Sequence, residues 1–397
     1  MRCIVLTLSI PKSELKQRQE KFMNNLSEQD VSGAILFSNI NIFYLTGFYF
    51  WTTERPIALI VNADSTMHLL VPRLELEHAE AFALVDKVFS YPEYPGTKHP
   101  MLYLKELLSE RHINVKHLGF DSNGYGSPSG YHGPSLTELF PTTNWKSIRK
   151  TLEEMRYIKS EKEIHLIKES LKWSTLAHEL LQKYSKDGQN EIEITNRASS
   201  EATAAMIKAL GPDFLPHGPT AYIVYRGQIG PMSAFPHAVT SNLTLKNGDT
   251  LVTGADATIW GYHSELERTM FVKEYSQEQY KYFQIMYEAQ EVAFRAIKPG
   301  IKCSYVEEQV QAYLKEQNVM HLTRHHTGHS IGLLNHEGPF LDLGDHTIIE
   351  KGMIFTIEPG IYVDGLGGFR HSETLLVTES GNEILTAYPR KIDELIC

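Results

Sequence analysis

The 397-residue sequence has little cysteine, no long apolar run and no cluster of basic residues. Its three cysteines, Cys3, Cys303 and Cys397, are odd in number and scattered, which argues for reduced thiols rather than a disulfide framework or a zinc site. No stretch approaches the roughly 18 apolar residues that a membrane span needs. The short apolar run at the start lacks the small-residue cleavage pattern of a signal peptide. We therefore expect a cytoplasmic protein without a membrane segment.

The charge balance points away from nucleic acid. Lysine and arginine number 38 against 48 acidic residues, which gives a net charge of −10, and no basic cluster suits a phosphate backbone. The remaining composition, 42% hydrophobic and 22% charged, is that of an ordinary globular protein. The length allows two domains, each with its own core.

Strand and helix patterns alternate in the first part of the chain. Short apolar runs predict strands, and an amphipathic pattern predicts helices, so we expect a small α/β domain with a mixed sheet. The expected strands are 33–37, 57–61, 68–71, 87–91 and 117–120, and the expected helices are 11–29 and 102–110. The second part is expected to contain helices at 162–184, 191–210, 277–297 and 306–316, flanking a curved, mainly antiparallel sheet.

The stretch from Gly248 to Val272 reads as a hairpin that carries acids. Its strands are expected at 250–258 and 262–272, with the bend at Trp260 and Gly261. Carboxylates inside apolar strands need a cation, a metal or a hydrogen-bonded substrate, unless the face is solvated. The candidate carboxylates are Asp256, Glu265 and Glu267.

Four further motifs bring acid, base or donor groups. A histidine follows a proline at Phe235-Pro236-His237, and the histidine-rich, glycine-spaced loop HHTGHSIGLLNHEGPF contains His329 and His336. Glu358 interrupts the apolar run MIFTIEPGIY, and GGFRHSETLLV contains Arg370 and Glu373. In the first half, Arg55 precedes Pro56 at the end of an aromatic stretch, where a guanidinium suits a carboxylate.

Over nearly its whole length, the chain resembles the creatinase, aminopeptidase P and prolidase family. The motifs that carry this resemblance are Arg55-Pro56, Phe235-Pro236-His237, Gly328-His329-Ser330-Ile331-Gly332 with His336-Glu337, and Glu358-Pro359-Gly360. The resemblance implies an α+β protein: a pita-bread domain at 156–397 preceded by a smaller α/β domain at 1–155. It also implies a homodimer whose active site lies at the subunit interface, with Arg55 holding a substrate carboxylate.

The match to the family's peptidases is incomplete at the metal ligands. The resemblance implies five ligands, of which His329 and Glu358 match and Glu265 is a longer substitute, whereas Gly254 and Ser372 stand at the other two positions. A metal site then needs Asp256 and Glu373 beside Glu265, His329 and Glu358. Glu373 is expected on the opposite strand face unless a bulge intervenes.

These departures favour a metal-independent enzyme without a cofactor. Leu266-Glu267-Arg268-Thr269 is shared with creatinase, although an arginine that creatinase has after the histidine motif is missing here. We expect a hydrolase of a C–N bond in a small, nitrogen-rich, carboxylated substrate, similar to creatinase and ectoine hydrolases. Its expected catalytic residues are His237 as proton shuttle, Glu267 and Glu358 on the cationic substrate group, and His329. The expected substrate contacts are Arg55, His336, Tyr262 and Arg370.

Two other functions remain open. The first is a metal-dependent Xaa-Pro dipeptidase or aminopeptidase with two divalent cations, manganese or cobalt, which the histidine loop and Glu358-Pro359-Gly360 support. The second is a binding module that has lost its metal and its activity. Cleavage of Xaa-Pro dipeptides stimulated by manganese or cobalt distinguishes the first from the others.

Overall fold

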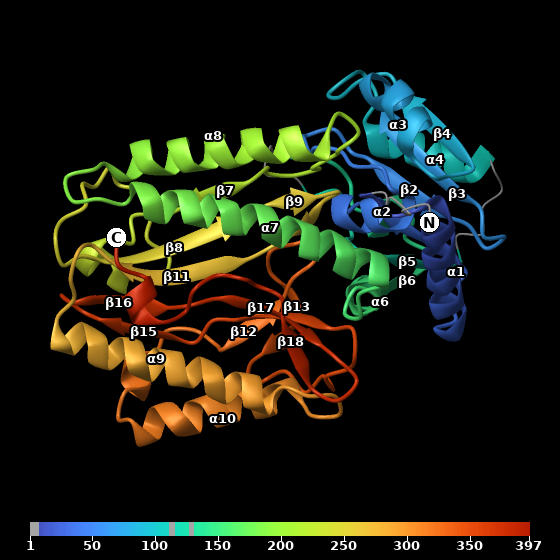
Figure 1. Cartoon of the computed structure of the whole chain (residues 1–397). Helices are drawn as coiled ribbons and strands as arrows, with labels where there is room; N and C mark the ends of the chain where they lie inside the picture. Colours follow the sequence, from blue (N-terminus) through green and yellow to red (C-terminus); the bar gives the residue numbers. More distant parts are fainter. Residues whose placement is uncertain (1–7, 111–115, 127–130) are drawn as a thin grey trace, which may run out of the picture. The chain divides into compact units, whose positions relative to one another are not determined.

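The computed structural model describes residues 8–110, 116–126 and 131–397, and the chain divides into two compact units (Figure 1). One extends from Ile10 to Arg156, and the other consists of Tyr157 to Cys397 together with the described residues before Ile10. Cys3 and most of the apolar run at the start lie outside the described residues. No helix in the described part of the chain is both long and apolar enough to cross a membrane.

The first unit contains one mixed six-stranded sheet in the order β4-β3-β2-β1-β5-β6. Its strands are β1 (Gly33–Leu36), β2 (Ala58–Val61), β3 (Met67–Pro72), β4 (Lys87–Tyr91), β5 (His117–Phe120) and β6 (Asn144–Ser147). The β1/β2 and β2/β3 pairs are antiparallel, whereas β3/β4, β1/β5 and β5/β6 are parallel. The expected mixed sheet is confirmed.

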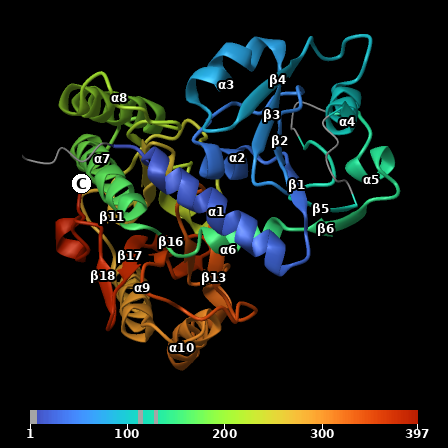
Figure 2. The same cartoon turned by 90° about the vertical axis from the view of Figure 1, so that its right-hand side faces the viewer.

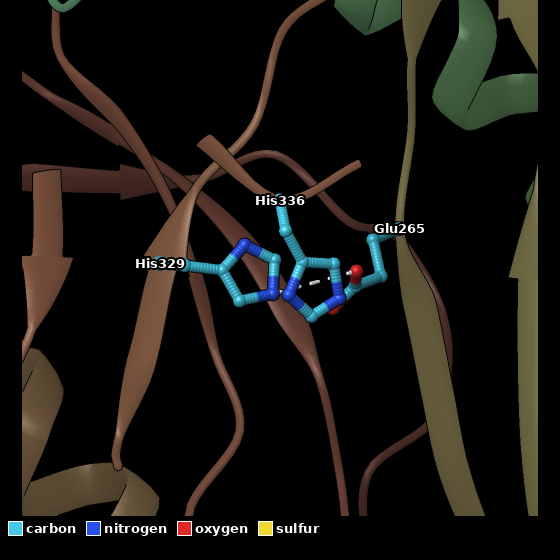
Figure 3. A group of neighbouring side chains, drawn as sticks. All are labelled: Glu265, His329 and His336. Atoms are coloured by element: carbon cyan, nitrogen blue, oxygen red, sulfur yellow. Dashed lines mark ion pairs between the residues drawn. The ribbon is translucent and has the colours of Figure 1, made fainter. Parts of the chain in front are cut away.

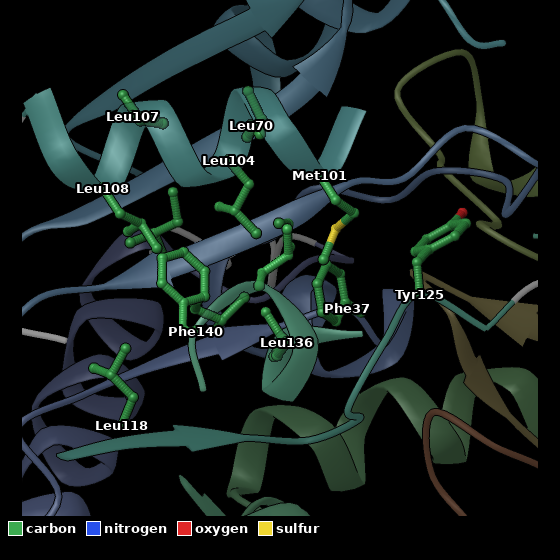
Figure 4. Close-up of a cluster of buried hydrophobic side chains, with 14 of the residues drawn as sticks. Phe37, Leu70, Met101, Leu104, Leu107, Leu108, Leu118, Tyr125, Leu136 and Phe140 are labelled. Atoms are coloured by element: carbon green, nitrogen blue, oxygen red, sulfur yellow. The ribbon is translucent and has the colours of Figure 1, made fainter. Parts of the chain in front are cut away.

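Helices of the first unit cover this sheet with apolar faces. They are α1 (Lys12–Glu28), α2 (Asn39–Thr46), η1 (Arg73–Glu75), α3 (Leu76–Phe82), α4 (Pro100–Glu110), α5 (Leu136–Leu139) and α6 (Arg149–Met155). In α4, Met101, Leu104 and Leu108 follow the 3.6-residue period and point into one buried cluster with Phe37 and Leu118 (Figure 4). This cluster is the core of the unit.

The aromatic stretch that ends in Arg55 starts as a helix that the sequence pattern does not reveal. Ser38 caps α2 by accepting from the Asn41 amide, and Gly47 ends it in the left-handed conformation at φ 74°. Nearly all of the helix is buried, including Phe43 and Tyr44. Because residues on every side of the helix are buried, the segment lacks the amphipathic period by which a helix is recognised in a sequence.

The second unit is built on several short antiparallel sheets. One has the order β11-β8-β7, a larger one β13-β12-β14-β17-β18, and two are hairpins, β9/β10 and β15/β16. The strands are β7 (Tyr222–Val224), β8 (Thr250–Asp256), β9 (Thr258–Ile259), β10 (Tyr262–His263), β11 (Leu266–Phe271), β12 (Gly328–Ser330), β13 (Glu337–Leu341), β14 (Ile354–Ile357), β15 (Gly360–Val363), β16 (Gly367–Arg370), β17 (Glu373–Val377) and β18 (Asn382–Ile384).

Two pairs of helices enclose these strands. The helices are α7 (Glu161–Tyr184), α8 (Glu191–Leu210), α9 (Gln277–Ala296) and α10 (Cys303–Glu316), with 3-10 turns η2 (Gly230–Ala234), η3 (Met320–Leu322) and η4 (Ile392–Glu394). Both views place the strands between α7/α8 and α9/α10 (Figures 1 and 2). Ser160 and Ser276 form capping boxes that start α7 and α9. The α+β pita-bread architecture is confirmed.

Candidate active site

The acid-bearing hairpin places its carboxylates by strand alternation. Antiparallel pairing of β8 with β11 sets Glu267 opposite Gly254 and Arg268 opposite Thr253. Glu265 directly precedes β11, so Glu265 and Glu267, two residues apart, face the same side while Arg268 faces the other. A Cβ at Gly254 would lie 3.3 Å from Glu267 Oε1. The glycine therefore leaves room for the longer glutamate across the hairpin.

Most of the predicted site residues meet at one cavity of about 490 Å³. Seven of the predicted residues line this cavity: His237, Asp256, Glu265, Glu267, His336, Glu358 and Arg370. They come from the segment after η2 (Gly230–Ala234), from the hairpin, from the histidine loop, from the end of β14 and from the end of β16. Separate strands thus bring the motifs into one pocket.

His329 is fully buried on β12 and is not among the residues that line this pocket, but its ring stacks on that of His336, which is. Its Nδ1 lies 3.0 Å from the Ser330 carbonyl oxygen, which fixes a proton on Nδ1 and leaves Nε2 with a free lone pair in the neutral ring. Nε2 lies 3.1 Å from Glu358 Oε1 and 3.8 Å from Glu265 Oε2, but neither contact has hydrogen-bond geometry. A buried nitrogen aimed at two carboxylates without a directed hydrogen bond is suited to a metal ion.

Glu265, His329 and His336 converge on one point in Figure 3, where the dashed line marks the pair of His329 with Glu265. The two imidazole rings stack with their centroids 3.8 Å apart. The hydroxyl of Ser372 donates a 2.7 Å hydrogen bond to Glu265 Oε1 and orients that carboxylate. The serine that replaces an expected ligand therefore supports the neighbouring one.

Burial and mutual charge shift the proton affinities of these groups. Burial, reinforced by Glu358, raises the pKa of Glu265 to about 8. Burial opposes the charged form of His329, but the carboxylates of Glu358 and Glu265 outweigh it and raise its pKa to about 9. For Glu358, burial is likewise outweighed by His329 and Arg370, which lower its pKa. Burial and the neighbouring His329 lower the pKa of His336 to about 4, so that ring is neutral at pH 7.

A second group in the pocket joins two guanidinium groups to one carboxylate. Arg370 donates hydrogen bonds to both oxygens of Glu267, from Nη2 to Oε1 at 2.9 Å and from Nε to Oε2. Arg226 Nη2 donates to the same Oε1 at 3.0 Å. Arg370 Nη1 also donates to the Tyr362 hydroxyl, which in turn contacts His325 Nε2 at 2.7 Å. We call Arg226, Glu267 and Arg370 the pocket cluster.

The donor atoms fit one divalent cation. Two groups in the described part of the chain have ligating atoms within 4.8 Å of one another: Glu265 with His329 and His336, and Glu265 with Glu267 and Glu358. In the second group, both oxygens of Glu267 are already held by guanidinium groups. The first group, with Glu358 beside His329, has the nitrogen and carboxylate donors that manganese, cobalt or zinc accept.

Three predicted residues lie away from these donor atoms. Tyr262 is buried and donates its hydroxyl proton to Glu163 Oε1 at 2.7 Å, and it is not among the residues that line the cavity. Glu373 pairs in register with Ile357 without a bulge and binds Arg268 in the core. Arg55 belongs to the first unit, where it pairs with Glu93 and Glu54. Asp256 lies in the cavity wall but contacts His263 Nδ1 at 2.9 Å.

Sequence reasoning missed Arg226 and His325. Arg226 follows β7 in the run YIVYRG, and no motif marks it. Its only signal is Gly227, which follows it at φ 71° in a turn closed by the bond from the Gln228 amide to the Tyr225 carbonyl oxygen. His325 lies in the histidine loop but outside the glycine-spaced core of that motif.

The fold and the carboxylate–histidine group define a hydrolase of the pita-bread class. Residues 165–379 match the profile of metallopeptidase family M24, and residues 18–158 match the creatinase/prolidase N-terminal domain. The chain belongs to metallopeptidase family M24.

Named relatives are peptidases. An uncharacterized peptidase of Staphylococcus aureus (strain USA300) is 27% identical over 93% of this chain and 99% of its own length. The prolidase from Pyrococcus furiosus is 26% identical with a TM-score of 0.73, covering 92% of this chain and 99% of that chain. A dipeptidase from Pyrococcus horikoshii OT3 is 26% identical with a TM-score of 0.79, covering 96% and 99%.

Two sequence-based predictions are therefore wrong. The main prediction, a metal-independent hydrolase similar to creatinase, is contradicted by similarity over nearly the whole chain to prolidase and dipeptidase structures and to peptidases. The prediction of no cofactor is contradicted by the metallopeptidase family match and by the ligating group at Glu265, His329 and His336. The error lay in treating the losses at Gly254 and Ser372 as the loss of the whole metal site.

Proposed function

We propose that this protein is a metal-dependent peptidase that cleaves the bond before proline in short Xaa-Pro peptides. The observation that carries the proposal is the fully buried Nε2 of His329, which faces Glu265 and Glu358 without a directed hydrogen bond. Support for the substrate class comes from the prolidase and dipeptidase structures that the chain resembles. The alternative of a binding module accounts less well for a ligating group inside a cavity of this size.

The chain's own residues hold the cation and orient the peptide. Glu265, His329 and Glu358 would hold one divalent cation, with His336 at the open side. A divalent cation there would act as a Lewis acid on the scissile carbonyl. His336, neutral at pH 7, offers an N–H to a substrate oxygen, and Ser372 keeps Glu265 in place. Buried Arg370 fixes Glu267, so this wall of the pocket is rigid.

The test is metal content together with peptide cleavage. Protein without a polyhistidine tag is measured by elemental mass spectrometry before and after chelation, and then assayed on Xaa-Pro dipeptides with manganese, cobalt or zinc restored. About one cation per chain and metal-restored cleavage are expected. A protein that binds no cation, or one that binds it and cleaves no Xaa-Pro peptide, would contradict the proposal.

We also propose a homodimer in the cytoplasm. The support is the family resemblance for the dimer, and the scattered, odd number of cysteines for the compartment. Sedimentation equilibrium measures the oligomeric state directly, and a monomer at micromolar concentration would contradict the proposed homodimer. Cell fractionation tests the compartment.

A further inference from the structure

The side chain of Arg226 lines the pocket but has no part in the proposed metal site. It follows β7 and lies in the left-handed region at φ 55°, which is uncommon for a residue with a side chain. This turn points Arg226 into the cavity wall, where its side chain remains 38% exposed. A strained backbone at a pocket wall is often retained for a functional contact.

The guanidinium of Arg226 is only partly used. Its Nη2 donates to Glu267 Oε1 at 3.0 Å, whereas its Nε is buried and has no hydrogen-bond partner in the described part of the chain. Glu267 does not need this contact for neutralisation, because the buried Arg370 already binds both of its oxygens. Two guanidinium groups on one carboxylate leave a positive charge facing the cavity.

Arg226 is also the cation best placed to meet a ligand. Among the described residues that line the cavity, the only other arginine or lysine is Arg370. All three nitrogens of Arg370 are engaged, by Glu267 and by the Tyr362 hydroxyl, and its side chain is 3% exposed. Glu358 comes no nearer to Arg370 than 3.8 Å and is shared with His329.

We propose that Arg226 binds the C-terminal carboxylate of the substrate and thereby restricts the enzyme to dipeptides with a free carboxylate. This inference rests on the proposed Xaa-Pro peptidase function. In a dipeptide, the carboxylate follows the scissile amide by a single Cα, so its anchor must lie close to the cation. Arg226 meets this requirement, because it bonds Glu267, whose ligating oxygen lies within 4.8 Å of those of Glu265 and Glu358.

The experiment compares Ala-Pro with Ala-Pro amide, which lacks the negative charge. Wild-type, Arg226→Met and Arg226→Lys enzymes are assayed with the metal restored, and Arg197→Met, an exposed arginine of α8 that pairs with Glu201, is the matched control. The wild type and the control should prefer the free acid by about 10- to 100-fold in kcat/KM, mainly through KM. Arg226→Met should abolish that preference, and Arg226→Lys should keep a part of it because the charge remains without the planar guanidinium fork.

Binding to the chelated protein separates this inference from the proposed function. Calorimetric titration of Ala-Pro into metal-free wild type should show binding that weakens by the same factor in Arg226→Met. Equal cleavage or binding of acid and amide by the wild type, or an unchanged preference in Arg226→Met, would overturn the inference. If Ala-Pro binds through Arg226 but no Xaa-Pro peptide is cleaved with any metal, the carboxylate site stands and the proposed function fails.

Discussion

The second unit contains two clusters of the same composition, each with two arginines on one glutamate, and they differ in what surrounds them. In the core cluster, Arg268 Nη2 lies 2.6 Å and Arg390 Nε 3.3 Å from Glu373 Oε1. In the pocket cluster, Arg226 and Arg370 hold Glu267. Strand β11 contributes one residue to each cluster. Neighbouring residues of a strand point to opposite faces, so Glu267 faces the cavity and Arg268 faces the core.

The core cluster is closed to a ligand by burial of Glu373, although Glu373 Oε2 and Arg390 Nε have no hydrogen-bond partner in the described part of the chain. Arg268 is fully buried and also donates to the carbonyl oxygens of Glu267, Ser372, Tyr388 and Pro389. The pocket cluster keeps the half-exposed Arg226 with an unpartnered Nε. The comparison teaches that burial, rather than residue types, separates an ion pair that stabilises the fold from one available to a substrate.

The largest effect is expected when the core cluster loses its carboxylate. Glu373→Gln leaves the fully buried Arg268 without a counter-charge, whereas Arg390 keeps its ion pair with Glu291, so we expect the free energy of unfolding to fall by about 3–5 kcal/mol. Glu267→Gln should cost less, about 1–2 kcal/mol, because Arg226 can turn toward solvent in the cavity. Urea unfolding of both metal-free variants measures the difference. Equal losses would break the proposed distinction between the two clusters.

The next effect concerns metal affinity rather than folding. His329→Ala removes the buried nitrogen donor, so we expect affinity for manganese to fall at least about 100-fold. Without metal, its free energy of unfolding should fall less than that of Glu373→Gln. Isothermal titration with manganese and urea unfolding measure the two quantities, and His321→Ala, an exposed histidine of η3, is the control. Unchanged affinity in His329→Ala would place the cation elsewhere.

Metal affinity should also depend on pH, because two of the proposed ligands bind protons when no metal is present. Glu265 with a pKa of about 8 and His329 with a pKa of about 9 are both largely protonated at pH 7 without metal. A cation must displace both protons, so affinity should rise by about 100-fold per pH unit between pH 6 and 8 and by about tenfold between pH 8 and 9, and level off above about pH 9. Titrations in buffers of different ionisation enthalpy count the released protons. A pH-independent affinity with no proton release would contradict this arrangement.

The sequence predicted the fold better than the function. Long amphipathic helices such as α7 and α8 and the acidic hairpin carry strong local periodicity, so their positions were predicted to within a few residues. Helix α2 was missed because burial on all sides removes that period. Among the site residues, Glu265, Glu267, His336 and Glu358 meet at one cavity, whereas no local pattern could reveal that Arg226 reaches Glu267 across 41 residues. Counting ligands by position also overlooked that Ser372 supports Glu265.

The smallest effect tests that supporting contact. Ser372→Ala removes the 2.7 Å hydrogen bond to Glu265 Oε1 but no ligating atom, so manganese affinity should fall by about tenfold, less than in His329→Ala. The backbone of Ser372 also pairs with Glu267, and alanine preserves that pairing, so stability should change little and the pocket cluster should stay in place. Isothermal titration of Ser372→Ala, with the exposed Ser109→Ala as control, measures the effect. An affinity equal to that of the wild type would mean that the backbone at the start of β11 alone holds Glu265 in place, and that the hydrogen bond from Ser372 contributes nothing to the order of the pocket.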